Sequence, residues 1–174
     1  ISKFKLNSKL DNEFYIVDST TLRIGKDKTK NSYSGYKHHH GVKFQVIVND
    51  QSIIQNISKA YPSSIHDKKL FICEYKDLSN KIDKSLKILG DKGYAGLGKY
   101  QLTIPIKRNK REYKKDKTLA KTNNQLISRK RIKIEHVFAY MKNFRILQRL
   151  NYYKMNKIEL FFQSIANIYN LSKF

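Results

Sequence analysis

Short apolar runs, rich in β-branched and aromatic residues, mark the first two thirds of the chain. Polar turn residues separate them, as between the second and third runs at Asn49–Asp50–Gln51. This pattern predicts five strands, over residues 14–18, 42–49, 52–58, 86–90 and 102–106. Pro105 places the fifth strand at a sheet edge or at a strand end. The polar stretch between the first two strands, residues 29–40, predicts a loop.

A helical period replaces the strand pattern after Pro62. Three segments repeat apolar residues every three or four positions and predict helices, over residues 65–79, about 127–142 and 157–171. Two segments lack such a period: residues 1–13 predict an arm or linker, and residues 107–125 predict a basic loop. The order β-β-β-α-β-β-α-α predicts one α/β domain over residues 14–174, with a mixed five-stranded sheet and flanking helices.

Charge narrows the class of partner. The chain has 36 Lys and Arg against 14 Asp and Glu in 174 residues, a formal net charge of +22. Such an excess favours a polyanion, most simply nucleic acid, over a membrane surface, because no amphipathic anchor and no long apolar run is present. The single cysteine, Cys73, excludes an internal disulfide framework and a cysteine-based zinc site.

The basic residues concentrate late in the chain. Residues 107–149 contain 15 Lys and Arg and 3 Asp and Glu. We expect the first of these cations to contact DNA phosphates without reading bases; they are Lys107, Arg108, Lys110 and Arg111. The alternative is a solvated flexible loop.

Three carboxylates are candidates for chemistry. Asp18 ends the first predicted strand, Asp91 follows the fourth, and Glu135 lies on the basic helix at the shoulder of its apolar face. If the first and fourth strands are parallel neighbours, Asp18 and Asp91 meet at their carboxyl ends. Three carboxylates brought together need a countercharge. A pair of Mg²⁺ or Mn²⁺ ions suits such oxygen ligands and serves phosphodiester chemistry.

Each candidate also has an ordinary structural interpretation. Asp18 and Asp91 can form turns through local hydrogen bonds, and Glu135 can be the i, i+4 partner of Arg131. Arg131 and Lys142 can be solvated surface charges. On this interpretation the chain is a non-catalytic basic protein that binds nucleic acid, with steep salt dependence and no requirement for a cation.

Five motifs in order carry a resemblance to a known family. They are Asp18-Ser-Thr, residues 33–49 (YSGYKHHHGVKFQVIVN), His66-Asp67, Asp91-Lys-Gly-Tyr, and Arg131-x3-Glu135-His136-x5-Lys142. In this order they resemble the DDE transposases of bacterial insertion sequences. The helix matches that family's Tyr-x2-Arg-x3-Glu-x6-Lys signature, except that Ser128 stands at the tyrosine position.

The resemblance implies a ribonuclease H-like fold and cleavage and transfer of DNA strands at transposon ends. It implies that Asp18, Asp91 and Glu135 hold two Mg²⁺ (or Mn²⁺) ions, and that Arg131 and Lys142 position phosphates. It further implies a homodimer on transposon-end and target DNA, located at the bacterial nucleoid in the cytoplasm. The alternative is that the chain is an inactive remnant of such a transposase. Because family members carry a separate N-terminal DNA-binding region, we expect this chain to be truncated or to be the second part of a split reading frame.

Overall fold

The computed structural model describes residues 14–25, 32–35, 38–80 and 86–174. The arm expected over residues 1–13, and parts of the loop expected over residues 29–40, lie outside this range.

Two long antiparallel strands form the centre of the sheet. In β1 (Phe14–Arg23) and β3 (His39–Asn49), the register runs from Tyr15 opposite Asn49 to Arg23 opposite Gly41. On the other side of β1 the strands are parallel: β6 (Lys87–Leu89) pairs with the start of β1, and β7 (Leu102–Thr103) pairs with β6. The two halves of the sheet therefore differ in strand direction.

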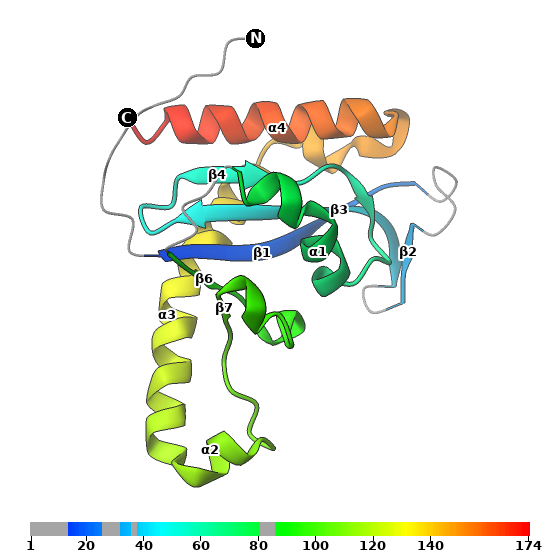
Figure 1. Ribbon diagram of the computed structural model, residues 1–174. Helices are drawn as coiled ribbons and strands as arrows, with labels where there is room; N and C mark the ends of the chain where they lie inside the picture. The colour runs from blue at the N-terminus through cyan, green and yellow to red at the C-terminus, as the bar shows by residue number, and fades with distance from the viewer. Residues whose placement is uncertain (1–13, 26–31, 36–37, 81–85) are drawn as a thin grey trace.

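Three short strands share the outer edge of β3. They are β2 (Tyr33–Ser34), β4 (Ile54–Ile57) and β5 (Tyr61–Pro62), each antiparallel to a different stretch of β3. The seven-stranded sheet is thus five strands across, with the order β4-β3-β1-β6-β7 through its middle (Figure 1). This is the mixed α/β sheet with flanking helices expected from the sequence, but it has seven strands rather than the five predicted, because the two-residue strands β2 and β5 are too short to give a pattern.

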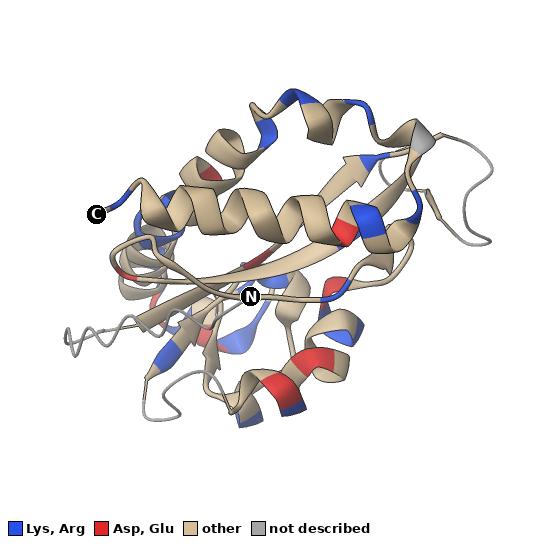
Figure 2. Cartoon of the chain, turned by 90° about the horizontal axis from the view of Figure 1, so that it is seen from above, with Lys and Arg blue, Asp and Glu red and all other residues tan. Residues whose placement is uncertain are grey.

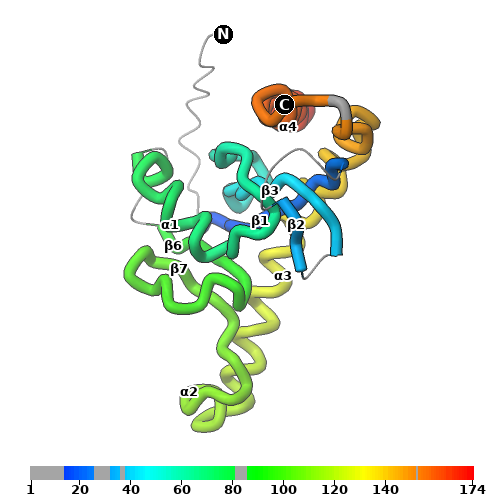
Figure 3. Tube along the Cα trace, turned by 90° about the vertical axis from the view of Figure 1, so that its right-hand side faces the viewer, coloured from blue at the N-terminus to red at the C-terminus, as the bar shows by residue number. Residues whose placement is uncertain are grey.

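Helices cover both faces of this sheet. One face packs against α1 (Asp67–Leu78), and the other packs against α3 (Lys117–Lys142) and α4 (Met155–Leu171), as the side view shows (Figure 3). Side chains of β1 alternate between the two layers: Tyr15 and Val17 join the α1 side, whereas Ile16 and Leu22 join the α3–α4 side. Every residue at the start of β1 is consequently buried.

Three predictions are corrected here. The stretch of residues 29–40, which was expected to be a loop, contains β2 and the first two residues of β3. The first strand continues past residue 18 to Arg23, because residues 19–23 also pair with β3. The basic loop expected over residues 107–125 instead contains α2 (Arg111–Lys115) and the first turns of α3, whose start Asp116 caps by accepting from the Leu119 amide at 2.8 Å. This part of α3 and α2 extend beyond the sheet (Figures 1 and 3). A helix with no packed face there lacks the apolar period by which helices are recognised.

Charge is unevenly distributed over the helices. The view from above shows that α4 is almost uncharged, with Lys157 and Glu159 as its only charged residues (Figure 2). Lys and Arg are dense along α2 and α3 instead. Within the described ranges, none of the helices combines the length and the apolar character needed to cross a bilayer.

Candidate active site

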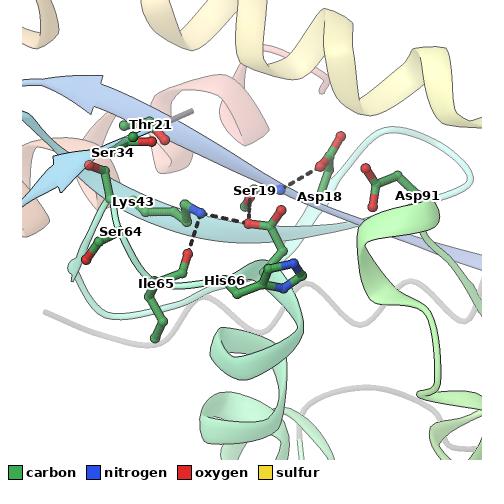
Figure 4. Close-up of a pocket in the computed structure, with 12 residues that line it drawn as sticks. Asp18, Ser19, Thr21, Ser34, Lys43, Ser64, Ile65, His66 and Asp91 are labelled. Atoms are coloured by element: carbon green, nitrogen blue, oxygen red, sulfur yellow. Dashed lines mark hydrogen bonds and ion pairs between the residues drawn. The ribbon is translucent and has the colours of Figure 1, made fainter. Parts of the chain in front are cut away.

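Asp18 and Asp91 meet where β1 and β6 separate. The parallel pairing of these strands ends at Ile16 and Leu89, so the chain after β6 turns away just before it reaches the level of Asp18. Asp91 lies in this turn and caps the short 3₁₀ helix η1 (Lys92–Tyr94). Both carboxylates line one cavity of about 540 Å³ and face the same space below α3 (Figure 4). The prediction that these two residues come together is correct, although Asp18 lies within its strand rather than at its end.

Local hydrogen bonds hold the two carboxylates in place. The backbone amide of Ser19 donates to Asp18 Oδ1 at 2.8 Å, and the amide of Gly93 donates to Asp91 Oδ1 at 2.7 Å. A Cβ atom at Gly93 would lie only 2.9 Å from Asp91 Oδ1, so glycine at this position leaves room for the carboxylate. Asp18 and Asp91 therefore form the local turn hydrogen bonds of the ordinary structural interpretation and also line one cavity.

Opposing interactions act on the pKa of Asp18. Burial raises the pKa of its carboxyl above the ordinary value of 3.8, and the nearby charge of Asp91 raises it further. Arg131 opposes this effect, because its Nη2 atom lies 2.8 Å from Asp18 Oδ2, and the bond from the Ser19 amide also lowers the pKa. In this structure, therefore, Arg131 on α3 supplies the countercharge that the acidic pair requires.

Glu135 does not join the aspartates. Its side chain is exposed one helical turn after Arg131, and it lines a neighbouring cavity of about 580 Å³ instead. Among the described residues, no three His, Cys, Asp or Glu side chains are grouped closely enough to hold a metal ion. Of the three predicted ligands, the structure brings two together and leaves the third nearby on α3, where Arg131 occupies the position facing Asp18.

A third carboxylate in the first cavity comes from Asp67, which sequence reasoning did not single out as a site residue. Asp67 Oδ1 accepts from Ser19 Oγ at 2.5 Å and from Lys43 Nζ at 3.0 Å. Lys43 Nζ also donates to the carbonyl oxygen of Ile65 at 2.5 Å. These bonds connect the start of α1 to β1 and β3, next to Asp18 (Figure 4). The His66-Asp67 pair was the available signal, but its spacing alone indicated only the start of a helix.

The predicted DNA-contacting cations lie in four places. Arg131 is partly buried against Asp18, and Arg108 lines the same cavity as Glu135. Lys107, Lys110 and Arg111 are exposed at the start of α2 or just before it, and Lys142 is exposed at the end of α3. Their contact with DNA stays a prediction.

The fold and the paired aspartates define an α/β domain with an acidic site at a sheet edge, and comparison with known proteins specifies the family. Residues 17–170 match the family model described as DDE superfamily endonuclease, and the chain belongs to this family. This confirms the resemblance to a DDE-type transposase of an insertion sequence.

A curated relative agrees with this family. The chain is 34% identical over 160 residues to the probable transposase for insertion sequence element IS702 of Microchaete diplosiphon, a match covering 88% of this chain and 54% of that protein. The chain thus spans about half the length of this curated relative. Among solved structures, a piggyBac transposase in a synaptic complex with hairpin DNA matches 57% of this chain and 24% of its own, with 17% identity and a TM-score of 0.39.

Proposed function

We propose that this chain is the catalytic domain of a transposase, which cleaves DNA at transposon ends and joins the freed 3′-hydroxyl to target DNA. The observation that carries the proposal is the pair of carboxylates, Asp18 and Asp91, in one cavity of a domain with a net charge of +22. In a chain so poor in acids, burial and the nearby charge of Asp91 both raise the pKa of Asp18, so the ionised form of this carboxyl opposes folding. Such an arrangement is typical of a functional site.

The donor set fits two hard divalent cations. Asp18 and Asp91 offer oxygen atoms only, as Mg²⁺ and Mn²⁺ prefer, and we propose that Glu135 completes the set from α3. Bound ions of this kind activate a water or hydroxyl nucleophile and stabilise the leaving oxygen of a phosphodiester. Burial keeps the pKa of Asp18 raised even with Arg131 beside it, so a bound cation would stabilise the ionised form of this carboxyl.

The basic residues of the chain hold the DNA in this proposal. Arg131, already beside Asp18, is placed to contact a phosphate at the cavity mouth, and the cations of α2 and α3 attract the rest of the backbone. Pairing two transposon ends requires two copies of the chain, so we propose a homodimer assembled on DNA in the bacterial cytoplasm.

A nicking assay tests the proposal. The substrate is a supercoiled plasmid carrying the two terminal sequences of the element, incubated with Mg²⁺, with Mn²⁺ or with EDTA. We expect cation-dependent nicking by the parent chain, and its loss in Asp18→Asn and Asp91→Asn with DNA binding retained. Asp77→Asn, which changes an exposed acid of α1, is the matched control and should nick normally.

Glu135→Gln tests whether Glu135 belongs to the catalytic site together with Asp18 and Asp91. Loss of nicking in this variant supports a three-carboxylate site, whereas normal nicking limits the site to the two aspartates. If Asp18→Asn or Asp91→Asn cut DNA as fast as the parent chain, the catalytic proposal would be wrong. Salt-sensitive binding without any cation-dependent nicking would leave the non-catalytic nucleic-acid-binding protein as the better description.

A further inference from the structure

A second cavity, lined by Glu135, lies beside the aspartates. Basic residues are the most numerous kind in its lining. It lies between α3, the segment before α2, and η1. One acid, Glu135, faces five basic side chains, which are Lys92, Arg108, Lys121, Arg129 and Arg131. We call this the α2–α3 cavity. A wall with this charge favours a polyanion over a neutral or cationic ligand.

One aromatic side chain lines the same cavity. Tyr113, on α2, is half-buried there, opposite the exposed face of α3 that carries Gln125 and Ser128. Basic side chains that follow a phosphate backbone, combined with an aromatic ring on which a base can stack, are the features by which proteins bind single-stranded nucleic acid. Gln125 and Ser128 add polar groups that can bond to base edges.

The walls of the α2–α3 cavity are held together by a specific contact. The amide of Ile106 donates to Asn124 Oδ1 at 2.7 Å, and Asn124 Nδ2 donates to the Ile106 carbonyl oxygen at 2.9 Å. This two-bond clamp ties the segment that carries Arg108 to the middle of α3. The clamp therefore sets the position of the backbone near Arg108 relative to α3 independently of any ligand.

The cavity lies next to the carboxylate pair. Arg131 lines the cavity and also bonds to Asp18, while Lys92, another lining residue, follows Asp91 in the chain. Its volume of about 580 Å³ falls within the range of pockets that hold small organic molecules, so it suits one or two nucleotides and not a length of duplex.

We propose that the α2–α3 cavity binds unpaired nucleotides of the DNA strand whose phosphate lies at Asp18 and Asp91, with a base stacked on Tyr113. The inference rests on the proposed function, since it names which form of DNA the same site takes. It predicts that the protein prefers DNA whose end is opened over fully paired DNA.

Binding without cleavage tests this preference. Three fluorescein-labelled DNAs of one sequence are titrated with the 174-residue chain in EDTA, and fluorescence anisotropy is followed. They are a fully paired duplex, the same duplex with three mismatched pairs at one end, and the single strand. The chain is expected to bind the opened duplex about tenfold more tightly than the paired one.

Variants at Tyr113 identify the source of the preference. Tyr113→Phe keeps the ring and should keep the tenfold ratio. Tyr113→Leu keeps apolar bulk on α2 but removes the stacking face, so the ratio should fall to about one while binding of the paired duplex is unchanged. Thermal unfolding followed by circular dichroism confirms that both variants are folded.

Charge is tested with a matched pair of double variants. Lys121→Ala with Arg129→Ala removes two cations of the cavity, and should reduce the slope of log affinity against log salt for the single strand by about 1.4. Lys154→Ala with Lys157→Ala removes two exposed cations at the start of α4, distant from the cavity, and should leave the ratio between opened and paired duplex unchanged.

The inference is overturned if the parent chain shows no preference for the opened duplex, if Tyr113→Leu retains the preference, or if the α4 double variant abolishes it. Because all measurements are made in EDTA, these outcomes are independent of nicking. A chain that prefers opened DNA and never nicks would refute the catalytic proposal alone, and a chain that nicks without such a preference would refute this inference alone.

Discussion

Replacing Arg131 by methionine tests whether this residue is the countercharge of the candidate site. Methionine keeps the apolar stem that packs along α3 but removes the guanidinium that bonds to Asp18 at 2.8 Å. Asp18→Asn is the complementary change, since an asparagine oxygen can still accept from the Ser19 amide. The two variants and their combination form a double-mutant cycle.

The expected coupling energy follows from the burial of the pair. The side chain of Arg131 is 15% exposed and that of Asp18 is 20% exposed, so the ion pair is neither a surface pair nor a fully buried one. Exposed pairs contribute about 0.2–1 kcal/mol, and breaking a buried pair costs about 3–5 kcal/mol. Some solvent screening remains here, so we expect a coupling energy of about 1–2 kcal/mol.

The effect of pH has a definite sign. The pKa of Asp18 is raised in the folded chain, so this chain takes up a proton before the unfolded chain does as the pH falls. Removing Arg131 raises the folded-state pKa further. The loss of stability in Arg131→Met should therefore be largest near pH 7, and should shrink as the pH falls through the folded-state pKa toward the ordinary value of 3.8.

Urea denaturation followed by circular dichroism measures all four proteins of the cycle at about pH 7, 5.5 and 4. Repeating the series in about 1 M salt should reduce the coupling energy, because the pair is partly exposed. A coupling energy below about 0.3 kcal/mol, or a stability loss in Arg131→Met that is the same at all three pH values, would refute the assignment of Arg131 as the countercharge.

Three further predictions concern the surroundings of the aspartates. Gly93→Ala places a Cβ atom 2.9 Å from Asp91 Oδ1, so it should displace this carboxylate and slow nicking about a hundredfold with little change in melting temperature; normal nicking would contradict it. Asp67→Asn weakens the bond to Lys43, and should lower the free energy of unfolding by about 1 kcal/mol in urea titrations, against no change in an Asp77→Asn control. Burial raises the pKa of Tyr94 well above 10.0, so the parent chain should lose about 1.4 kcal/mol of stability for each pH unit above this value relative to Tyr94→Phe; parallel alkaline unfolding curves would contradict this.

Much of the fold follows from local patterns in the sequence. The sequences of residues 14–18 and 42–49 identified the two central strands, because short apolar runs rich in β-branched and aromatic residues are visible in any window of a few residues. The last helix, α4, was predicted to within two residues at its start, since one face packs on the sheet. The polar helix α2 was missed because it has no such face.

The candidate site was likewise predicted from the sequence only in part. Asp18 and Asp91 were located from the sequence because both follow apolar strand residues, and parallel neighbouring strands bring such positions to one edge of the sheet. By itself, then, the sequence determined the central strands, the main helices, the basic character and the acidic pair, all of which depend on short-range patterns and composition.

Tertiary packing alone decided the partners of that pair. The bond between Asp18 and Arg131 joins residues 113 positions apart, and the bond between Ser19 and Asp67 joins residues 48 apart. Glu135 lies one turn after Arg131 on the same side of α3, yet only Arg131 reaches Asp18, and Glu135 is exposed in the neighbouring cavity. Such choices depend on how a helix docks on a sheet, and no local pattern records docking, because the energy that selects it comes from contacts between distant segments.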